Sequence, residues 1–156
     1  MSEDVMTDSP VMRVAVVDDS SMMRGVLREL IESNPAWSVV LEASDGQQAI
    51  DRLAGNPVDL IMLDIEMPRM GGLAFLSACR PVTFAPVIVV SSVAHPMSPT
   101  LIQAVELGAA DVLAKPSGAL SLNIEDGYAN RIRESIRRVT SASAALTDLA
   151  QQRGAA

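Results

Sequence analysis

Apolar residues along this chain gather in short unbroken runs, without the strict alternation typical of a half-exposed sheet. Strands of a parallel sheet have this pattern because helices cover both of their faces. The first run begins at Met12 and leads to Asp18. Similar runs predict four more strands, at residues 38–43, 58–64, 87–90 and 111–114.

Between the runs, apolar residues recur every three or four positions, the spacing of one face of a helix. This spacing predicts helices near residues 22–31, 47–53, 73–79, 100–107 and 124–139. Five strands that alternate with helices favour an α/β fold, a doubly wound five-stranded parallel sheet. Right-handed crossovers leave few topologies, and we choose the flavodoxin-like (βα)5 order 2-1-3-4-5.

The same pattern divides the chain into three parts. Residues 1–10 are polar and acidic and are expected to form a disordered N-terminal tail. Residues 11–140 contain all the predicted strands and helices and form one domain. Residues 141–156 are rich in Ala and Ser, with Leu146 and Leu149 as the only large apolar residues. That composition is typical of a linker or a partly helical tail.

Four of the runs end in polar residues that could handle a phosphoryl group. In chain order these residues are Asp18-Asp19, Asp64, Ser91 and Lys115. The carboxyl ends of parallel strands share one edge of the sheet, where open α/β folds bind their ligands. We therefore expect these side chains to meet in one crevice.

The three acids of this set repel one another and stay ionised together only with a cation between them. Oxygen ligands with room for water suit Mg²⁺, which takes one or two carboxylates together with phosphate oxygens. Lys115 offers a positive charge to a phosphate or to Asp64, and Ser91 offers a hydroxyl donor. Asp64 is then a candidate nucleophile toward phosphorus, with an aspartyl-phosphate as product.

Composition narrows the classes of function. A net charge of −7 and a pI near 4.6 argue against nucleic-acid binding, which needs a basic surface. No apolar run reaches the roughly 20 residues of a membrane helix, and the first residues lack the pattern of a signal peptide. A single cysteine, Cys79, fits a reducing compartment. We therefore expect a cytoplasmic protein without membrane insertion.

Five motifs, taken in order, resemble the receiver domain of two-component response regulators over residues 11–140. They are Val17-Asp18-Asp19-Ser20, Asp64, Met67-Pro68 with Gly72, Val90-Ser91-Ser92 and Lys115-Pro116. Segments 64–70, 115–118 and 121–125 are similar to those in the receiver of chemotaxis protein-glutamate methylesterases.

This resemblance implies a phosphorylation-dependent signalling switch. Asp64 would accept a phosphoryl group from a sensor histidine kinase of the chemotaxis type, and Ser91 and Lys115 would hold that group. The output face would lie within residues 100–139. A C-terminal methylesterase domain would belong to a longer parent protein, so the chain itself is not expected to be an enzyme.

The resemblance also implies a set of metal ligands. Asp19 and Asp64 would bind Mg²⁺ directly, and Asp18 would bind it largely through water. Glu66 would contribute its backbone carbonyl.

Three features depart from the family pattern. Val112 stands where many receivers have an aromatic residue that rotates on activation, which argues against that kind of switch here. Gly71 replaces a common Asp or Asn and gives a weaker helix cap. No G-x-S-x-G-like nucleophile turn occurs, so this chain is not expected to hydrolyse a glutamyl ester by itself.

Several alternatives stay open at this point. The chain could be a stand-alone regulator, and homodimerisation is left open. A phosphatase that uses an aspartyl-phosphate would fit Asp64 with Glu66, but no cap insertion is present. A dinucleotide-binding module would need a G-x-G-x-x-G turn after the first strand. A receiver that is never phosphorylated is disfavoured by the complete set of acids, serine and lysine.

Three further residue groups receive simpler interpretations. His95 is expected to be an exposed loop histidine. The arginines between residues 131 and 138 are expected on a solvated helix face. The Lys115–Pro116 bond is hypothesised to be cis, which would fix the direction of Lys115.

Overall fold

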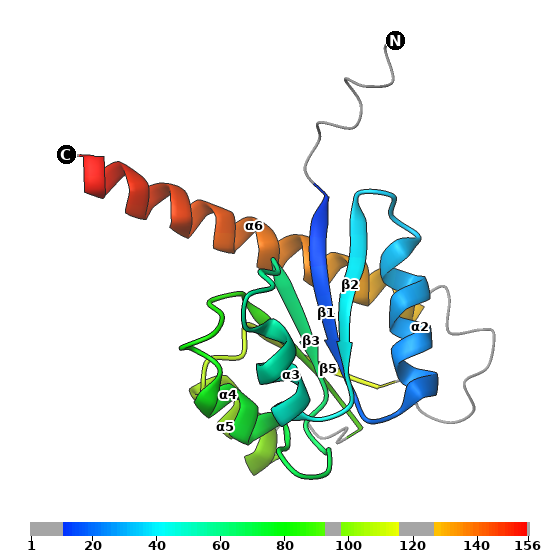
Figure 1. Cartoon of the computed structure of the whole chain (residues 1–156). Helices are drawn as coiled ribbons and strands as arrows, with labels where there is room; N and C mark the ends of the chain where they lie inside the picture. The colour runs from blue at the N-terminus through cyan, green and yellow to red at the C-terminus, as the bar shows by residue number, and fades with distance from the viewer. Residues whose placement is uncertain (1–10, 93–97, 116–126, 156) are drawn as a thin grey trace.

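A computed structural model describes residues 11–92, 98–115 and 127–155 of the chain. A five-stranded parallel sheet lies at its centre, with helices on both sides (Figure 1). The strand order β2-β1-β3-β4-β5 confirms the predicted fold class and order. The strands are β1 (Met12–Val17), β2 (Trp37–Ala43), β3 (Leu60–Leu63), β4 (Val87–Ser91) and β5 (Asp111–Ala114).

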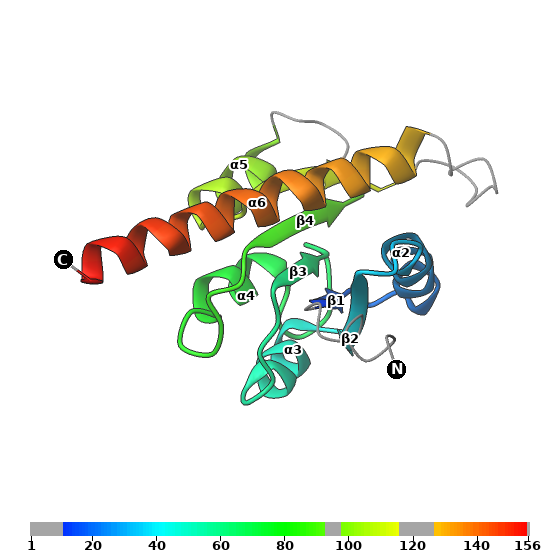
Figure 2. The ribbon, with the colours of Figure 1, turned by 90° about the horizontal axis from the view of Figure 1, so that it is seen from above.

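The helices lie in two layers. They are α2 (Ser21–Glu32), α3 (Gly46–Leu53), α4 (Gly72–Ala78), α5 (Pro99–Glu106) and α6 (Gly127–Ala155). Helices α2 and α3 lie on opposite sides of the sheet, as Figures 1 and 2 show. Helices α4 and α5 share the side of α3, and α6 shares the side of α2, because their buried residues fall into two separate core clusters.

Alternation along the strands sends successive side chains into the two clusters. In β1, Val14 and Val16 enter the cluster beneath α2 and α6, and Ala15 and Val17 enter the other. We call the first of these the α2/α6 cluster. Its buried members are Val14, Val16, Met23, Leu27, Ile31, Val39, Leu60, Met62, Ile88, Val90, Tyr128, Ile132, Ile136 and Val139. Both faces of the sheet are thus covered, which explains the unbroken apolar runs.

Side-chain caps fix where most of the helices begin. The hydroxyl of Ser20 accepts from the Met23 amide at 3.1 Å, and Asp45 accepts from the Gln48 amide at 2.8 Å. Ser98 caps α5 in the same way. At α4 the cap residue is Gly71, which makes no side-chain bond, so the predicted weaker cap is confirmed.

Strand β3 begins at Leu60, two residues after the predicted start at Val58. The Asp59 carboxylate accepts the Arg13 amide at 2.8 Å. The Asp59 amide in turn donates to the Arg13 carbonyl at 2.7 Å, and the ladder between the two strands runs on from Val14 and Leu60.

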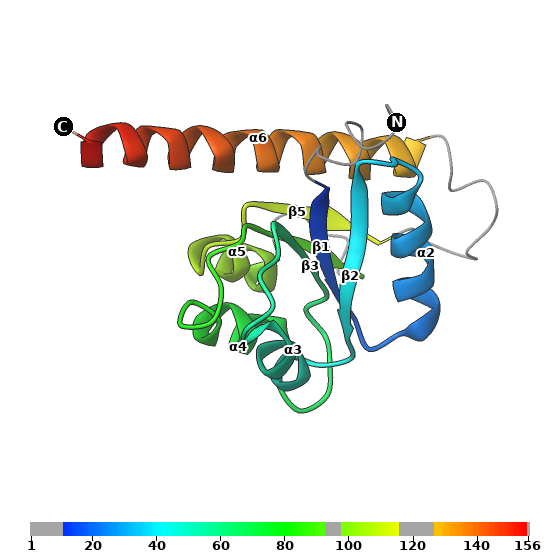
Figure 3. The same cartoon turned by 45° about the horizontal axis from the view of Figure 1, so that its top comes forward.

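The end of the chain is more helical than the predicted linker or partly helical tail. Residues 141–155 continue α6 without a break and extend it past the sheet (Figure 3). Ala, Leu and Gln are good helix formers, and no proline interrupts them. Whether this segment links two domains stays a prediction.

The predicted solvated face is confirmed, since Arg131, Arg137 and Arg138 are exposed, but several of these arginines also make contacts with the sheet layer. The Arg137 guanidinium lies over the Trp37 ring, 5.6 Å from its centre. Arg138 pairs with Asp111 at 2.5 Å, and Arg133 donates to the Ser33 hydroxyl at 3.0 Å. These contacts tie α6 to β2, β5 and the end of α2.

Three other sequence interpretations have different outcomes. Cys79, which was used only to infer the redox compartment, is buried among apolar residues and packs as a small core residue. His95 and Pro116 lie outside the described residues, so the interpretations placed on them stay predictions. Within the described ranges, no helix is both long enough and apolar enough to cross a membrane.

Candidate functional site

The parallel register brings the predicted site residues to one edge of the sheet. Val17 pairs with Leu63, and Leu63 pairs with Val89. Each strand then ends within two residues of these pairs, where the chain places Asp18-Asp19, Asp64, Ser91 and, after β5, Lys115.

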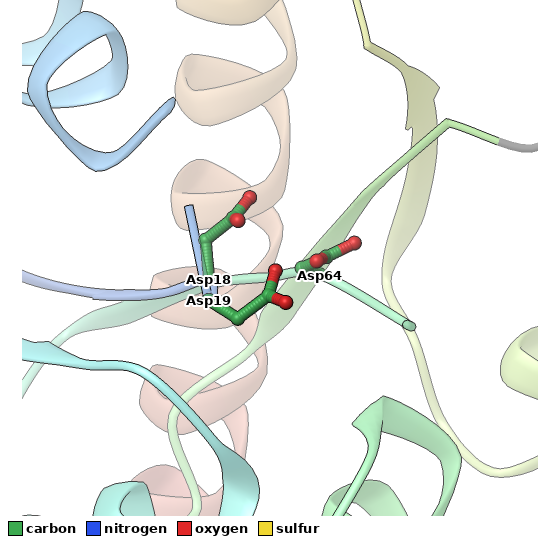
Figure 4. Close-up of side chains that lie close together, drawn as sticks. All are labelled: Asp18, Asp19 and Asp64. Carbon is green, nitrogen blue, oxygen red and sulfur yellow. The ribbon is translucent and has the colours of Figure 1, made fainter. Parts of the chain in front are cut away.

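The three acids form one cluster. One carboxylate oxygen from each of Asp18, Asp19 and Asp64 lies within 4.8 Å of the others. Figure 4 shows the three carboxylates gathered at the ends of β1 and β3. Asp18 and Asp64 are buried, and Asp19 is exposed to solvent. Three hard oxygen donors with one open side fit a divalent cation such as Mg²⁺, which keeps several waters.

Backbone contacts hold the two buried acids in place. The Asp64 amide donates to the Val17 carbonyl at 2.8 Å, and the Asp18 amide donates to the Ala43 carbonyl at 3.0 Å. Asp18 Oδ1 accepts the Ser20 amide at 2.9 Å. Arg24 donates to the Asp18 carbonyl at 2.7 Å. These bonds extend the sheet to the residues that carry the carboxylates.

Lys115 supplies the positive charge of the cluster. Its Nζ lies 3.0 Å from Asp18 Oδ2 and 3.4 Å from Asp64 Oδ1. Its amide donates to the Ser91 carbonyl at 2.8 Å, which anchors the residue to β4. Burial alone would lower the pKa of Lys115, but hydrogen bonding to Asp18 and the charges of both acids outweigh it and raise the pKa. The lysine is therefore held as a cation between the two acids.

For Asp64, in contrast to Lys115, the environment disfavours the charged form. Burial and the negative charge of Asp18 raise the pKa of Asp64 to about 6, although Lys115 and the Glu66 amide offset part of the rise. The carboxylate is ionised at neutral pH, but its charge is poorly stabilised. A carboxylate in that state favours binding a cation and is a reactive nucleophile.

Ser91 and Glu66 complete the predicted set. Ser91 is fully buried at the end of β4. Glu66 is exposed, and its carboxylate accepts the Ser92 hydroxyl at 3.1 Å. The structure therefore places Glu66 beside the cluster, with its side chain engaged toward β4. The use of its carbonyl as a metal ligand stays a prediction.

The contacts that hold the loop after Asp64 were missed from the sequence. Arg69 adopts a left-handed backbone conformation, with φ of 63°, and its guanidinium pairs with the Asp45 carboxylate. Next to it, the Gly46 amide donates to the Met70 carbonyl at 2.7 Å. These contacts fasten the loop to the first turn of α3. No periodic pattern in a sequence reveals an ion pair between residues so far apart along the chain.

Gly72 was identified from the sequence as part of a motif, but the reason for a glycine there was not. A Cβ at this position would lie 2.5 Å from the Asp64 carbonyl oxygen and 2.8 Å from Ile65 Cα. Only glycine lets α4 begin so close to the end of β3. The glycine pair of the sequence thus sets the approach of α4 to the acid cluster.

Position 112 carries an aliphatic valine, and no aromatic ring is available there. It is partly buried and packs against the core cluster on the α3, α4 and α5 side. This placement agrees with the departure noted in the sequence.

Comparison with known proteins supplies the family context. The family model described as "Response regulator receiver domain" matches residues 14–124. A protein-glutamate methylesterase/protein-glutamine glutaminase of Symbiobacterium thermophilum is 46% identical over 112 residues, which are 72% of this chain and 31% of that protein. The curated relatives that the chain matches are about three times longer, since it covers between 31% and 37% of the first eight.

Two solved structures agree with this assignment. The response regulator domain of Thermotoga maritima CheB superposes with a TM-score of 0.76 at 37% identity, and covers 84% of this chain and 97% of that domain. A structure of the P1 domain of CheA3 in complex with CheY6 from R. sphaeroides matches with a TM-score of 0.65 at 42% identity, over 82% of this chain and 98% of that one. The resemblance drawn from the five motifs is confirmed.

Proposed function

Because the chain belongs to the response regulator receiver family, we propose that Asp64 is the phospho-acceptor of a signalling switch. The observation that carries the proposal is the position of Lys115, 3.4 Å from Asp64 and held as a cation. Attack on phosphorus needs an ionised carboxylate and a nearby positive charge for the phosphoryl oxygens. The site supplies both.

In the transfer step, a carboxylate oxygen of Asp64 forms a bond to phosphorus. The phosphorus–nitrogen bond of a kinase phosphohistidine breaks at the same time, and the leaving imidazole takes up a proton from solvent. Lys115 and the buried Ser91 would hold the transferred oxygens. A divalent ion bound by Asp18, Asp19, Asp64 and the Glu66 carbonyl would neutralise charge on the phosphoryl group.

The donor is proposed to be a histidine kinase of the chemotaxis type. The structural relative from R. sphaeroides was solved with the P1 domain of CheA3, which supports this choice. The regulated effector is proposed to be a methylesterase domain in a longer parent protein, since the curated relatives carry that activity. We propose a cytoplasmic location and no catalytic activity of this chain toward outside substrates.

Intact-mass measurement tests the acceptor. The protein is incubated with Mg²⁺ and acetyl phosphate, with and without EDTA. We expect the mass of one phosphate to be added, and we expect none in Asp64→Asn or in EDTA. Asp51→Asn, which removes an exposed acid of α3, is the matched control and should be labelled like the parent chain.

Two outcomes would contradict the proposal. Labelling that persists in Asp64→Asn would place the acceptor elsewhere. Repeated turnover of unrelated phosphomonoesters would indicate a phosphatase in place of a switch.

A further inference from the structure

The first turn of α6 carries a buried tyrosine with an unusual environment. Tyr128 is 7% exposed, and its hydroxyl has no hydrogen-bond partner among the described residues. Arg131 lies over its ring, 5.9 Å from the centre. A buried hydroxyl without a partner is destabilising, so Tyr128 is not explained by packing alone.

A second buried polar atom also lacks a hydrogen-bond partner among the described residues. Within the described part of the chain, Asp18 Oδ2 has no hydrogen-bond donor that meets normal geometry. Its only close neighbour of opposite charge there is Lys115 Nζ at 3.0 Å, whereas Asp18 Oδ1 accepts the Ser20 amide. The two unsatisfied atoms are complementary, because a phenol donates and a carboxylate oxygen accepts.

Strand alternation places the two groups on the same side of the sheet. Val16 and Met62 belong to the α2/α6 cluster with Tyr128, and Leu113 packs against it. These three residues precede Asp18, Asp64 and Lys115 by two positions each, so the site side chains leave the strands on the face that Tyr128 covers.

The electrostatics agree with this placement. Burial raises the pKa of the Tyr128 phenol, Arg131 partly offsets the rise, and the negative charge of Asp18 adds to it.

We propose that Tyr128 is a positioning residue of the switch, whose hydroxyl becomes the hydrogen-bond donor to Asp18 Oδ2 when a phosphoryl group on Asp64 draws Lys115 away. The inference rests on the function proposed above. A phosphoryl group carries nearly two negative charges and competes strongly with Asp18 for the single lysine. Asp18 Oδ2 would then lose its ion pair while still buried.

A hydrogen bond from the Tyr128 hydroxyl to Asp18 Oδ2 would give each of the two buried atoms a partner. Because Tyr128 lies in the first turn of α6, the contact would draw that turn toward the acid cluster. Phosphorylation of Asp64 would in this way change the position of the first turn of α6. No aromatic residue at position 112 is needed for such coupling.

The test compares Tyr128→Phe with Thr140→Val. The control removes another hydroxyl of α6, one that bonds only to carbonyls of its own helix among the described residues. Beryllofluoride with Mg²⁺ serves as the phosphoryl analogue, and hydrogen exchange is followed at the amides of residues 131–135. We expect exchange there to slow about tenfold on binding in the parent chain and in Thr140→Val, and less than about twofold in Tyr128→Phe.

Stability without the analogue provides a second readout. Phenylalanine keeps the ring and removes the unpaired hydroxyl, so the urea midpoint of Tyr128→Phe should equal or exceed that of the parent chain. A lower midpoint would mean that the hydroxyl is already bonded, and would overturn the inference.

The remaining outcomes are distinguishable. If beryllofluoride binds all three proteins and slows exchange equally, α6 is coupled without Tyr128 and the inference is wrong. If beryllofluoride fails to bind the parent chain, as judged by its fluorine resonance, the proposed function itself fails and the inference falls with it.

Discussion

Asp64 is buried beside another acid, and its ionisation therefore lowers the free energy of unfolding in a way that depends on pH. Its pKa of about 6 lies above the ordinary 3.8, so between these values the folded chain binds the proton more tightly than the unfolded chain. The contribution of Asp64 to stability is present below about pH 4 and is lost as pH rises through 6.

We predict that Asp64→Asn stabilises the metal-free protein at pH 7.5. The expected gain is about 1–2 kcal/mol after allowance for solvent screening, and it should vanish near pH 4. Urea unfolding in EDTA at both pH values measures it. Added Mg²⁺ should reduce the difference, because a cation stabilises the ionised acid. A gain that is equal at the two pH values would contradict the argument.

Lys115 is the only lysine of the chain, so its chemistry can be followed without interference from other lysines. Asp18 helps to raise its pKa and keeps it protonated. We predict that Asp18→Asn lowers this pKa and speeds acylation of Lys115 by amine reagents at pH 8 several-fold. Each unit of pKa corresponds to about a tenfold change in free amine. Peptide mass spectrometry measures the rate, and Asp51→Asn should leave it unchanged.

The convergence of the candidate site residues was predictable from the sequence because each of them follows an apolar run. Asp18, Asp64 and Lys115 stand where strand ends must converge in a parallel sheet. Tyr128 was not readable in this way. The apolar periodicity of α6 predicts only that the Tyr128 side chain faces the core. It does not predict the surroundings of the hydroxyl.

Among the elements, α4 depends most on a single residue. A Cβ at Gly72 would meet the backbone of Asp64 and Ile65, which cannot move aside as a flexible side chain would. We predict that Gly72→Ala lowers the free energy of unfolding by at least about 2 kcal/mol. It should also slow phosphorylation, because Asp64 would be displaced.

The matched control for that substitution is Gly25→Ala. Gly25 is exposed in the interior of α2, and a Cβ there would meet nothing within 4 Å. Alanine should therefore stabilise the helix by up to about 1 kcal/mol. Urea unfolding of both variants gives the comparison. Equal effects of the two substitutions would show that α4 can shift away from β3.

The order of elements was predictable, whereas some of their ends were not. Apolar runs marked all five strands, but the run from Val58 did not reveal that Asp59 binds Arg13 through both its amide and its side chain, just before the ladder begins. The end of α6 was missed for a different reason. Its last residues lack an apolar stripe, so only helix propensity and the continuity of the backbone support them.

On the scale of the whole molecule, the contacts described for α6 concentrate in its first half, and the large apolar side chains described beyond it are exposed. Contacts of Arg133, Arg137 and Arg138 fasten the first half, while Leu146 and Leu149 in the second half are 67% and 56% exposed. Short helices without packing are marginal in water.

We therefore predict a steep gradient of hydrogen exchange along α6. Amides of residues 145–155 should exchange at least about a hundredfold faster than those of residues 132–139 in dilute protein. Exchange followed by mass spectrometry or NMR measures the gradient. Uniform protection would contradict it and would mean that the far half is covered, for instance by a second copy of the chain.

The length of α6 makes it a lever. As a continuous helix, its 29 residues extend roughly 43 Å at 1.5 Å per residue. Whenever the far half is helical, a tilt of about ten degrees about Tyr128 would carry its end through roughly 7 Å, by the same geometry. A rearrangement of one hydrogen bond near the sheet edge would thus be converted into a displacement larger than a helical turn, in a place where no part of the acid cluster can reach.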